Sequence, residues 1–276
     1  MKEQPKLTTT IHDRNYYGED SLIYPVLSRR VQGISVGINT SPSKLCNFSC
    51  IYCEVDRTAG GGILKFNLDV ADLQFRRVLA DVQDGKLGNE SIKAVTLSGD
   101  GEPTSLLNFE EVIRKVIETR DSFGLADAKL VVISNASGLH RETVKKGLRL
   151  MDVNNGELWA KLDAGTDDYF KLIAQTRVKF DRVLSNILAA SQIRPIKIQT
   201  CFMNINGEMP KEEEICVYCD KVNNIVNNGG QISAIQLYTV SRPTAESYVT
   251  ALSDNQMDYV AQRLQENIAV PVEVYK

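Results

Sequence analysis

The sequence has few histidines, few cysteines and no long hydrophobic run. It contains two histidines and six cysteines among 276 residues. Neither His12 nor His140 lies close in sequence to the most closely spaced cysteines, which disfavours a Cys/His zinc site. Six cysteines in a chain that opens without a secretory leader do not predict a disulfide framework. No apolar run approaches the roughly 20 residues of a membrane span.

The chain also lacks an excess of charge of either sign. Its 32 Lys and Arg and 35 Asp and Glu give a net charge of −3 and a pI near 5.6. This balance gives no electrostatic reason to expect a broad nucleic-acid interface, although a local basic face can coexist with it. Reduced thiols and the lack of a leader predict a cytoplasmic protein with no membrane partner.

Strand-like and helix-like segments alternate along the chain. Six apolar segments are expected strands, and seven segments with helical periodicity are expected helices. Six β-then-α units predict a parallel sheet, but they are too few for an eight-unit barrel. No Gly-x-Gly-x-x-Gly opens the first helix, so a dinucleotide fold is not expected. The expected strands are 34–39, 92–98, 130–134, 158–163, 196–202 and 232–238, and the expected helices are 68–82, 108–120, 141–150, 167–174, 180–192, 211–226 and 254–265.

The predicted fold class is therefore α/β, as a partial, open (β/α)6 TIM-like barrel. We expect an N-terminal extension over residues 1–30 and the partial barrel over 31–246. Residues 247–276 should form a C-terminal helix and tail that pack on the barrel.

Three cysteines form the most informative motif. Cys46, Cys50 and Cys53 have C-x3-C-x2-C spacing just after the first expected strand. Three thiolates can hold three irons of a cubane iron–sulfur cluster, which leaves the fourth iron open for a small molecule. Zinc binding and chance spacing are the alternatives.

Polar and glycine-rich segments follow several expected strands, where ligands bind in such sheets. Asn135 and Asp163 could equally cap the helices that follow them. The glycines after the second strand would let backbone carbonyls approach a charged amine. The segments are Gly99–Pro103, Asn135, Asp163 and Tyr238–Arg242.

The cysteine motif with Tyr52, followed by Ser98–Pro103, resembles the radical S-adenosylmethionine (SAM) superfamily. The likeness runs from about residue 24 to 246. Further segments resemble the branch of wyosine-type tRNA-modifying synthases and their uncharacterised relatives; they are Leu27–Arg30, Ser98–Pro103, Leu162–Gly165 and Tyr238–Glu246.

This resemblance implies an oxidoreductase in which Cys46, Cys50 and Cys53 ligate a [4Fe–4S] cluster and SAM binds the open iron. An electron donor such as flavodoxin or ferredoxin would drive cleavage of SAM to a 5′-deoxyadenosyl radical. The turn Gly-Asp-Gly-Glu is one residue longer than the usual Gly-Gly-Glu of the superfamily. The implied SAM-contacting residues are Tyr52, Gly99, Asp100, Gly101, Glu102, Asn135, Lys161, Asp163, Tyr238, Thr239 and Val240.

The other three cysteines are expected to be buried thiols, with an auxiliary cluster as the alternative. Cys216 and Cys219 should share one face of a helix, and Cys201 ends the fifth expected strand.

Several substrates and functions remain open from the sequence. A tRNA nucleoside is suggested by the resemblance, and a basic rim of Arg29, Arg30, Arg57 and Arg242 could accept its phosphates. Peptide or small-molecule modification and glycyl-radical activation are alternatives within the enzyme class. An iron–sulfur electron carrier or redox sensor is an alternative from a different class, but it would need no SAM pocket.

Overall fold

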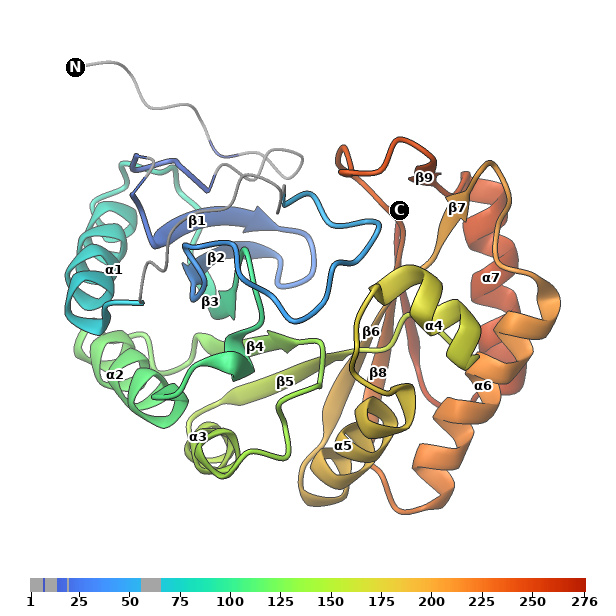
Figure 1. The fold of residues 1–276 in the computed structure, drawn as a ribbon. Coiled ribbons are helices and arrows are strands. Elements are labelled where there is room, and N and C mark those ends of the chain that lie inside the picture. Colours follow the sequence, from blue (N-terminus) through green and yellow to red (C-terminus); the bar gives the residue numbers. More distant parts are fainter. Residues whose placement is uncertain (1–6, 8–13, 19, 56–65) are drawn as a thin grey trace. The chain divides into compact units, whose positions relative to one another are not determined.

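The computed structural model describes residues 7, 14–18, 20–55 and 66–276 (Figure 1). The chain forms two compact units, and each is described by itself. The expected divisions at residues 30 and 246 stay a prediction. The N-terminal unit comprises Met1–Leu45, Gly60–Ile133 and Arg141–Glu157, and the C-terminal unit comprises Cys46–Ala59, Ser134–His140 and Leu158–Lys276.

Four strands form the sheet of the N-terminal unit in the order β1-β2-β3-β4. Strand β1 is antiparallel to β2, and β2, β3 and β4 are parallel to one another. Pro25 is tolerated in β1 because this strand ends the sheet, where one row of backbone groups needs no partner. The strands are β1 (Ile23–Ser28), β2 (Gly33–Asn39), β3 (Ile92–Ser98) and β4 (Lys129–Ser134).

Three helices lie on one side of these strands in Figure 1: α1 (Leu68–Gln83), α2 (Phe109–Ser122) and α3 (Glu142–Asp152). Asn67 caps α1, since its side chain accepts hydrogen bonds from the backbone N–H groups of Asp69 and Val70 at 3.1 Å each. A single 3-10 turn, η1 (Pro103–Ser105), follows β3.

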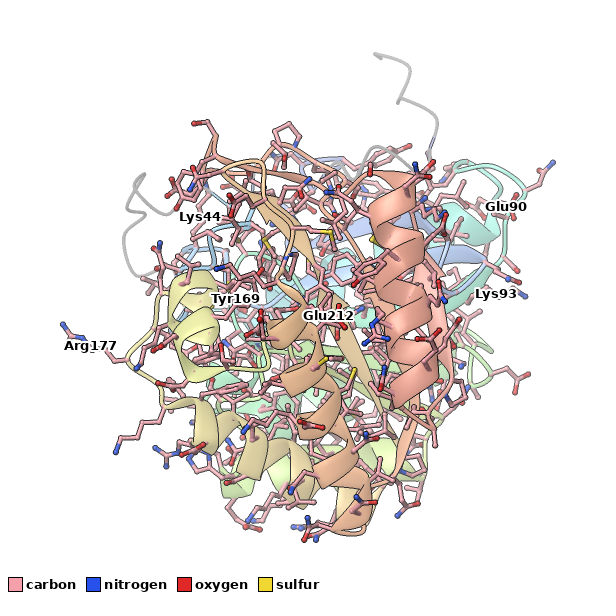
Figure 2. The ribbon with its side chains drawn as sticks, turned by 90° about the vertical axis from the view of Figure 1, so that its right-hand side faces the viewer. Lys44, Glu90, Lys93, Tyr169, Arg177 and Glu212 are labelled. Carbon is pink, nitrogen blue, oxygen red and sulfur yellow. The ribbon has the colours of Figure 1, made fainter. Side chains whose placement is uncertain are left out.

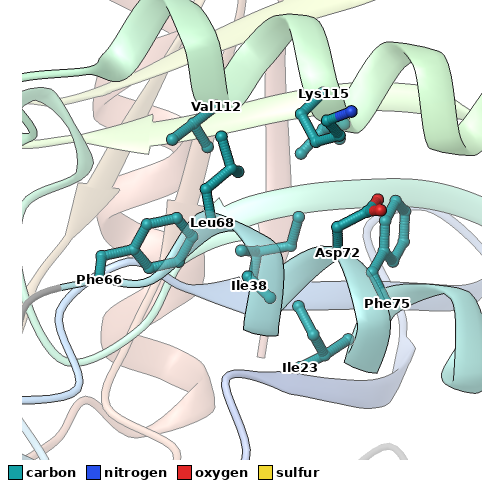
Figure 3. Close-up of a pocket in the computed structure, with 10 residues that line it drawn as sticks. Ile23, Ile38, Phe66, Leu68, Asp72, Phe75, Val112 and Lys115 are labelled. Atoms are coloured by element: carbon teal, nitrogen blue, oxygen red, sulfur yellow. The ribbon is translucent and has the colours of Figure 1, made fainter.

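An apolar hollow lies between α1, α2 and the first two strands (Figure 3). Its lining includes Ile23, Ile38, Leu68, Phe75 and Val112, and among the described residues Asp72 and Lys115 are its charged side chains. This hollow belongs to the hydrophobic core of the N-terminal unit.

The C-terminal unit has four parallel strands in the order β5-β6-β8-β10. A second sheet pairs two short antiparallel strands, β7 (Met203–Ile205) and β9 (Val249–Ala251). The parallel strands are β5 (Gly156–Lys161), β6 (Ile196–Cys201), β8 (Ile232–Tyr238) and β10 (Val272–Tyr275), and the helices are α4 (Asp167–Ala174), α5 (Phe180–Ile193), α6 (Glu212–Asn227) and α7 (Asp254–Asn267).

The two faces of this sheet differ in polarity. Thr200 faces helix α6, because its hydroxyl lies 2.6 Å from the hydroxyl of the fully buried Tyr218. The opposite face carries a row of polar side chains in register on neighbouring strands: Lys161, Gln199, Gln236 and Glu273. The Gln199 amide donates to the Gln236 carbonyl oxygen at 2.9 Å. A polar face on a parallel sheet is unusual, since both faces are normally apolar, and it suits a sheet that holds a polar ligand.

All six expected strands and all seven expected helices are present. The sequence did not predict β1, β7, β9 and β10. Among the described residues, no helix is long and apolar enough to cross a membrane.

Candidate active site

The three motif cysteines lie on one loop of the C-terminal unit. Cys46, Cys50 and Cys53 are half-buried, and none of them forms a disulfide. The loop is tied to the end of helix α4, because the backbone N–H groups of Ser49 and Ile51 donate to the carbonyls of Ala174 and Ile173 at 3.0 Å each. Two of the last four carbonyls of α4, which the helix itself leaves unpaired, thus hold the cysteine loop.

Side chains of the loop add further anchors. Phe48 is buried and packs edge-on against Phe170, which in turn stacks on Phe180. The Asn47 amide donates to the Ser137 hydroxyl at 2.7 Å and accepts from the Asn135 amide at 2.9 Å. The loop is therefore held by side-chain contacts to two other segments of the C-terminal unit.

The residues after β8 hold the far end of the loop. The backbone N–H of Ala245 donates to the carbonyl of Cys53 at 3.2 Å. Arg242 forms an ion pair with Glu54, which follows the last cysteine directly. The segment after β8 thus binds the end of the cysteine motif through one hydrogen bond and one ion pair.

Asp163 is the centre of a buried polar network beside the cysteines. Its carboxylate accepts from the Tyr52 hydroxyl at 2.7 Å and from the backbone N–H of Cys201 at 2.8 Å. It also forms a 3.0 Å ion pair with Lys161. The Lys161 ammonium lies 5.1 Å from the ring centroid of Tyr52 and 4.7 Å from that of Tyr238, and it donates to the Tyr238 hydroxyl.

This network fixes the charge of its members. Burial opposes the charge of Lys161, but the attraction of Asp163, with contributions from Tyr238 and Cys201, outweighs burial and raises the lysine pKa. Burial, followed by the negative charge of Asp163, raises the pKa of Tyr52. Near neutral pH the site therefore contains a lysine ammonium and a neutral tyrosine.

Near the cysteines, the negative charge of Asp163 and the other thiols outweighs the positive charge of Lys161. Burial, then Asp163 and Cys46, raises the pKa of Cys50, and Cys53 adds to the effect. Metal binding would supply further positive charge and hold the thiolate form. Among the described residues, no three His, Cys, Asp or Glu side chains are placed to hold a single ion. The ligands of a cubane need no such convergence, because each thiolate binds a different iron.

The predicted glycine turn belongs to the N-terminal unit. Asp100 pairs there with Arg14 and accepts from the Asn39 amide at 2.8 Å. The Glu102 carboxylate is buried and caps η1 by accepting from the backbone N–H of Thr104 at 3.0 Å.

Gly101 makes a close approach within that turn. A Cβ added to Gly101 would lie 2.3 Å from the carbonyl oxygen of Leu45 and 2.5 Å from the Cβ of Ser41. Only glycine fits there, because a side chain would displace the segment that leads into Cys46.

The remaining predicted site residues lie in the C-terminal unit. The side-chain oxygen of Asn135 accepts from the backbone N–H of Ser137, and its NH2 group donates to Asn47, so Asn135 joins its own loop to the cysteine loop. Thr239 accepts from the backbone N–H of Leu252 at 2.8 Å, and Val240 packs against a buried apolar cluster described below. Neither Asn135 nor Asp163 caps a helix: the caps of α3 and α4 are Arg141 and Thr166.

Cys201 and Cys219 are buried, as expected for structural thiols, and Cys216 is half-buried on α6 near Glu212. Arg57 of the predicted basic rim lies outside the described residues.

The role of Glu214 was not predicted from the sequence. Its buried carboxylate accepts from the backbone N–H groups of Gly165 and Thr166 and, at 2.6 Å, from the Thr166 hydroxyl. It thus completes the start of α4, whose other end holds the cysteine loop. The close approach requires Gly165, since a Cβ there would lie 2.2 Å from the backbone nitrogen of Tyr218. The one indication in the sequence was Gly165, two residues after Asp163.

This chain is similar to a known family and to several known proteins. The family model described as the Radical SAM superfamily matches residues 40–219, which is more than half of the chain. A UPF0026 protein of Methanocaldococcus jannaschii is 29% identical over 228 residues, covering 82% of this chain and 65% of that protein. A Brachyspira hyodysenteriae protein named GTPase Obg is 25% identical over 252 residues, covering 91% of this chain and 34% of that protein. The chain thus spans less than two thirds of the length of either relative.

Solved structures show the same fold. A structure of TYW1 with a lysine–pyruvate adduct bound has a TM-score of 0.57 at 18% identity, covering 85% of this chain and 74% of that chain. Streptococcus suis SuiB bound to S-adenosylmethionine also has a TM-score of 0.57, at 13% identity, covering 87% of this chain and 47% of that chain. The fold is therefore α/β, of the partial TIM-like barrel type. Together with the family match, it shows that this chain belongs to the radical SAM superfamily, whose cofactors are a [4Fe–4S] cluster and SAM.

Proposed function

We propose that this chain is a radical SAM enzyme whose cluster is held by Cys46, Cys50 and Cys53. When bound, the cluster and SAM supply reductive cleavage to methionine and a 5′-deoxyadenosyl radical, which abstracts a hydrogen atom from the substrate. The observation that carries this proposal is the loop of three half-buried thiols, fixed by contacts to α4 and to Asp163, within a chain of this family.

We propose SAM contacts from the C-terminal unit by Tyr52, Asn135, Lys161, Asp163 and the segment 238–240. Lys161 offers a positive charge to the SAM carboxylate, and backbone groups of residues 238–240 can form hydrogen bonds with adenine. Asp163 already accepts three donors, and its main task in this arrangement is to orient Tyr52 and Lys161. A role of the Gly99–Glu102 turn toward SAM stays a prediction.

SAM cleavage is the direct test. Cluster-loaded protein reduced with dithionite in the presence of SAM should yield 5′-deoxyadenosine, measured by liquid chromatography. Flavodoxin or ferredoxin is the proposed donor in place of dithionite. If the protein holds a reducible cluster whose EPR spectrum does not change on addition of SAM, the enzyme proposal is rejected. The function would then be that of an electron carrier or redox sensor.

The substrate that we place first is a tRNA nucleoside, on the resemblance to wyosine-type synthases. Peptides, small molecules and a glycyl-radical partner are the alternatives. TYW1 is described with a lysine–pyruvate adduct, but Lys161 is poorly suited to form one. Its ion pair with Asp163 holds it as an ammonium, which has no free electron pair for attack on a carbonyl.

Salt dependence tests the tRNA proposal. Arg29 is exposed, whereas Arg242 is already paired with Glu54. Replacing Arg29 and Arg30 with alanine should weaken tRNA binding at low salt by about tenfold and flatten its salt dependence. Filter binding at two salt concentrations measures this, with Lys145→Ala/Lys146→Ala on α3 as the matched charge control. Absence of tRNA binding by the unmodified protein at low salt would favour a small-molecule or peptide substrate.

A further inference from the structure

The hydroxyl of Tyr169 is buried without a hydrogen-bond partner. Tyr169 lies in the first turn of α4 (Figure 2), where its backbone N–H donates to the hydroxyl of the cap residue Thr166 at 3.2 Å. Among the described residues, nothing accepts from or donates to the Tyr169 hydroxyl. A buried polar group left unpaired costs about 1–3 kcal/mol, so a partner from outside the chain is favoured.

The surroundings of Tyr169 are those of the candidate site. It packs against a buried cluster formed by Ile51, Ile173, Cys201, Met203 and Val249. Ile51 belongs to the cysteine loop, and Cys201 ends β6. Other aromatic and aliphatic side chains on the same cluster are only partly buried: Tyr52, Ile205, Tyr238, Val240 and Tyr248.

The acceptors near this hydroxyl already have donors. Burial, followed by the electrostatic influence of Glu214, Cys201 and Asp163, raises the pKa of Tyr169, so the phenol stays neutral and can donate. The Glu214 carboxylate is engaged by Gly165 and Thr166, and the Asp163 carboxylate by Tyr52, Lys161 and Cys201. The Tyr169 hydroxyl is thus a hydrogen-bond donor, and the nearby carboxylates of Glu214 and Asp163 already accept from other groups.

We propose that Tyr169 donates a hydrogen bond to the adenine base of SAM. This inference rests on the proposed function and adds a contact that the sequence did not indicate. Partly buried aromatic and aliphatic side chains suit a flat heteroaromatic ring, and the ring nitrogens of adenine accept hydrogen bonds in its plane. The ligand satisfies the hydroxyl that the protein leaves unpaired.

The test compares Tyr169→Phe with the unmodified protein, both loaded with the cluster. The probe is S-adenosylhomocysteine, which carries the same adenosine and is not cleaved, and calorimetry measures its Kd. Losing one hydrogen bond should raise the Kd about tenfold while iron content stays unchanged. The matched control is Tyr259→Phe, which removes the same atom from an exposed tyrosine on α7 that pairs with Glu212; its Kd should equal that of the unmodified protein.

Thermal unfolding without ligand gives a second readout. Tyr169→Phe should be at least as stable as the unmodified protein, because the change removes an unpaired buried group. An unchanged Kd in this variant would overturn the inference and assign the hydroxyl to an ordered water. If the variant fails to fold, 3-fluorotyrosine placed at position 169 reports the same contact by ¹⁹F NMR, and no shift at saturating probe would overturn it. Failure of the unmodified protein to bind the probe would instead reject the proposed function and this inference with it.

Discussion

Replacing any one of Cys46, Cys50 and Cys53 with alanine should leave the protein without a cluster. The unmodified chain, purified without oxygen and reconstituted, should be brown and hold about four irons. Each variant should be colourless with iron near zero, because the two remaining thiolates of an already open cluster cannot retain it. Iron and sulfide analysis and the visible spectrum measure the loss.

The matched control is the triple alanine variant of Cys201, Cys216 and Cys219. These thiols are buried or face Glu212 on α6, and the variant should keep the iron content of the unmodified protein. Loss of about half the iron with the fold intact would reveal an auxiliary cluster. Stoichiometric zinc without iron in the unmodified protein would reject the iron–sulfur site altogether.

Asp163→Asn should destabilise the protein by about 3 kcal/mol, the lower end of the cost of breaking a buried ion pair. The oxygen of the amide can still accept from the backbone N–H of Cys201, and its NH2 group can donate to the hydroxyl oxygen of Tyr52. The loss therefore comes mainly from the carboxylate charge. Lys161, whose side chain is only 15% exposed, then keeps its positive charge with no counter-charge from Asp163. Urea unfolding of the cluster-free protein measures the free energy of unfolding.

Two further variants distinguish the loss of the ion pair from a nonspecific loss of stability. Lys161→Met in the Asp163→Asn background should recover most of the lost free energy, because it removes the isolated charge. Asp167→Asn is the surface control: its side chain is 55% exposed and pairs with Lys171, and its loss should cost less than about 0.5 kcal/mol. If Asp163→Asn is as stable as the unmodified protein, the ion pair does not organise the site.

The periodicity of the sequence was enough to locate the central strands and helices. Each of these elements follows from contiguous residues, such as the apolar run 34–39 or the Asn67 cap before α1. Two elements at the edges were not predicted. Strand β10 has only four residues, all half-buried, and β1 contains Pro25, which argues against a strand in the sequence.

The sequence by itself determined the family and the cofactor chemistry, because the C-x3-C-x2-C spacing is a local property of eight residues. Only the tertiary structure decided what the polar residues do. The Tyr52 hydroxyl bonds to Asp163, which is 111 positions away in the sequence, and the Glu214 carboxylate bonds to Gly165 before α4, which is 49 positions away. For Asp163, capping a helix and facing a ligand were equal options from its neighbours in sequence. Long-range packing excluded the helix cap, since it brought Lys161, Tyr52 and the end of β6 to this carboxylate, and the contact with a ligand stays a prediction.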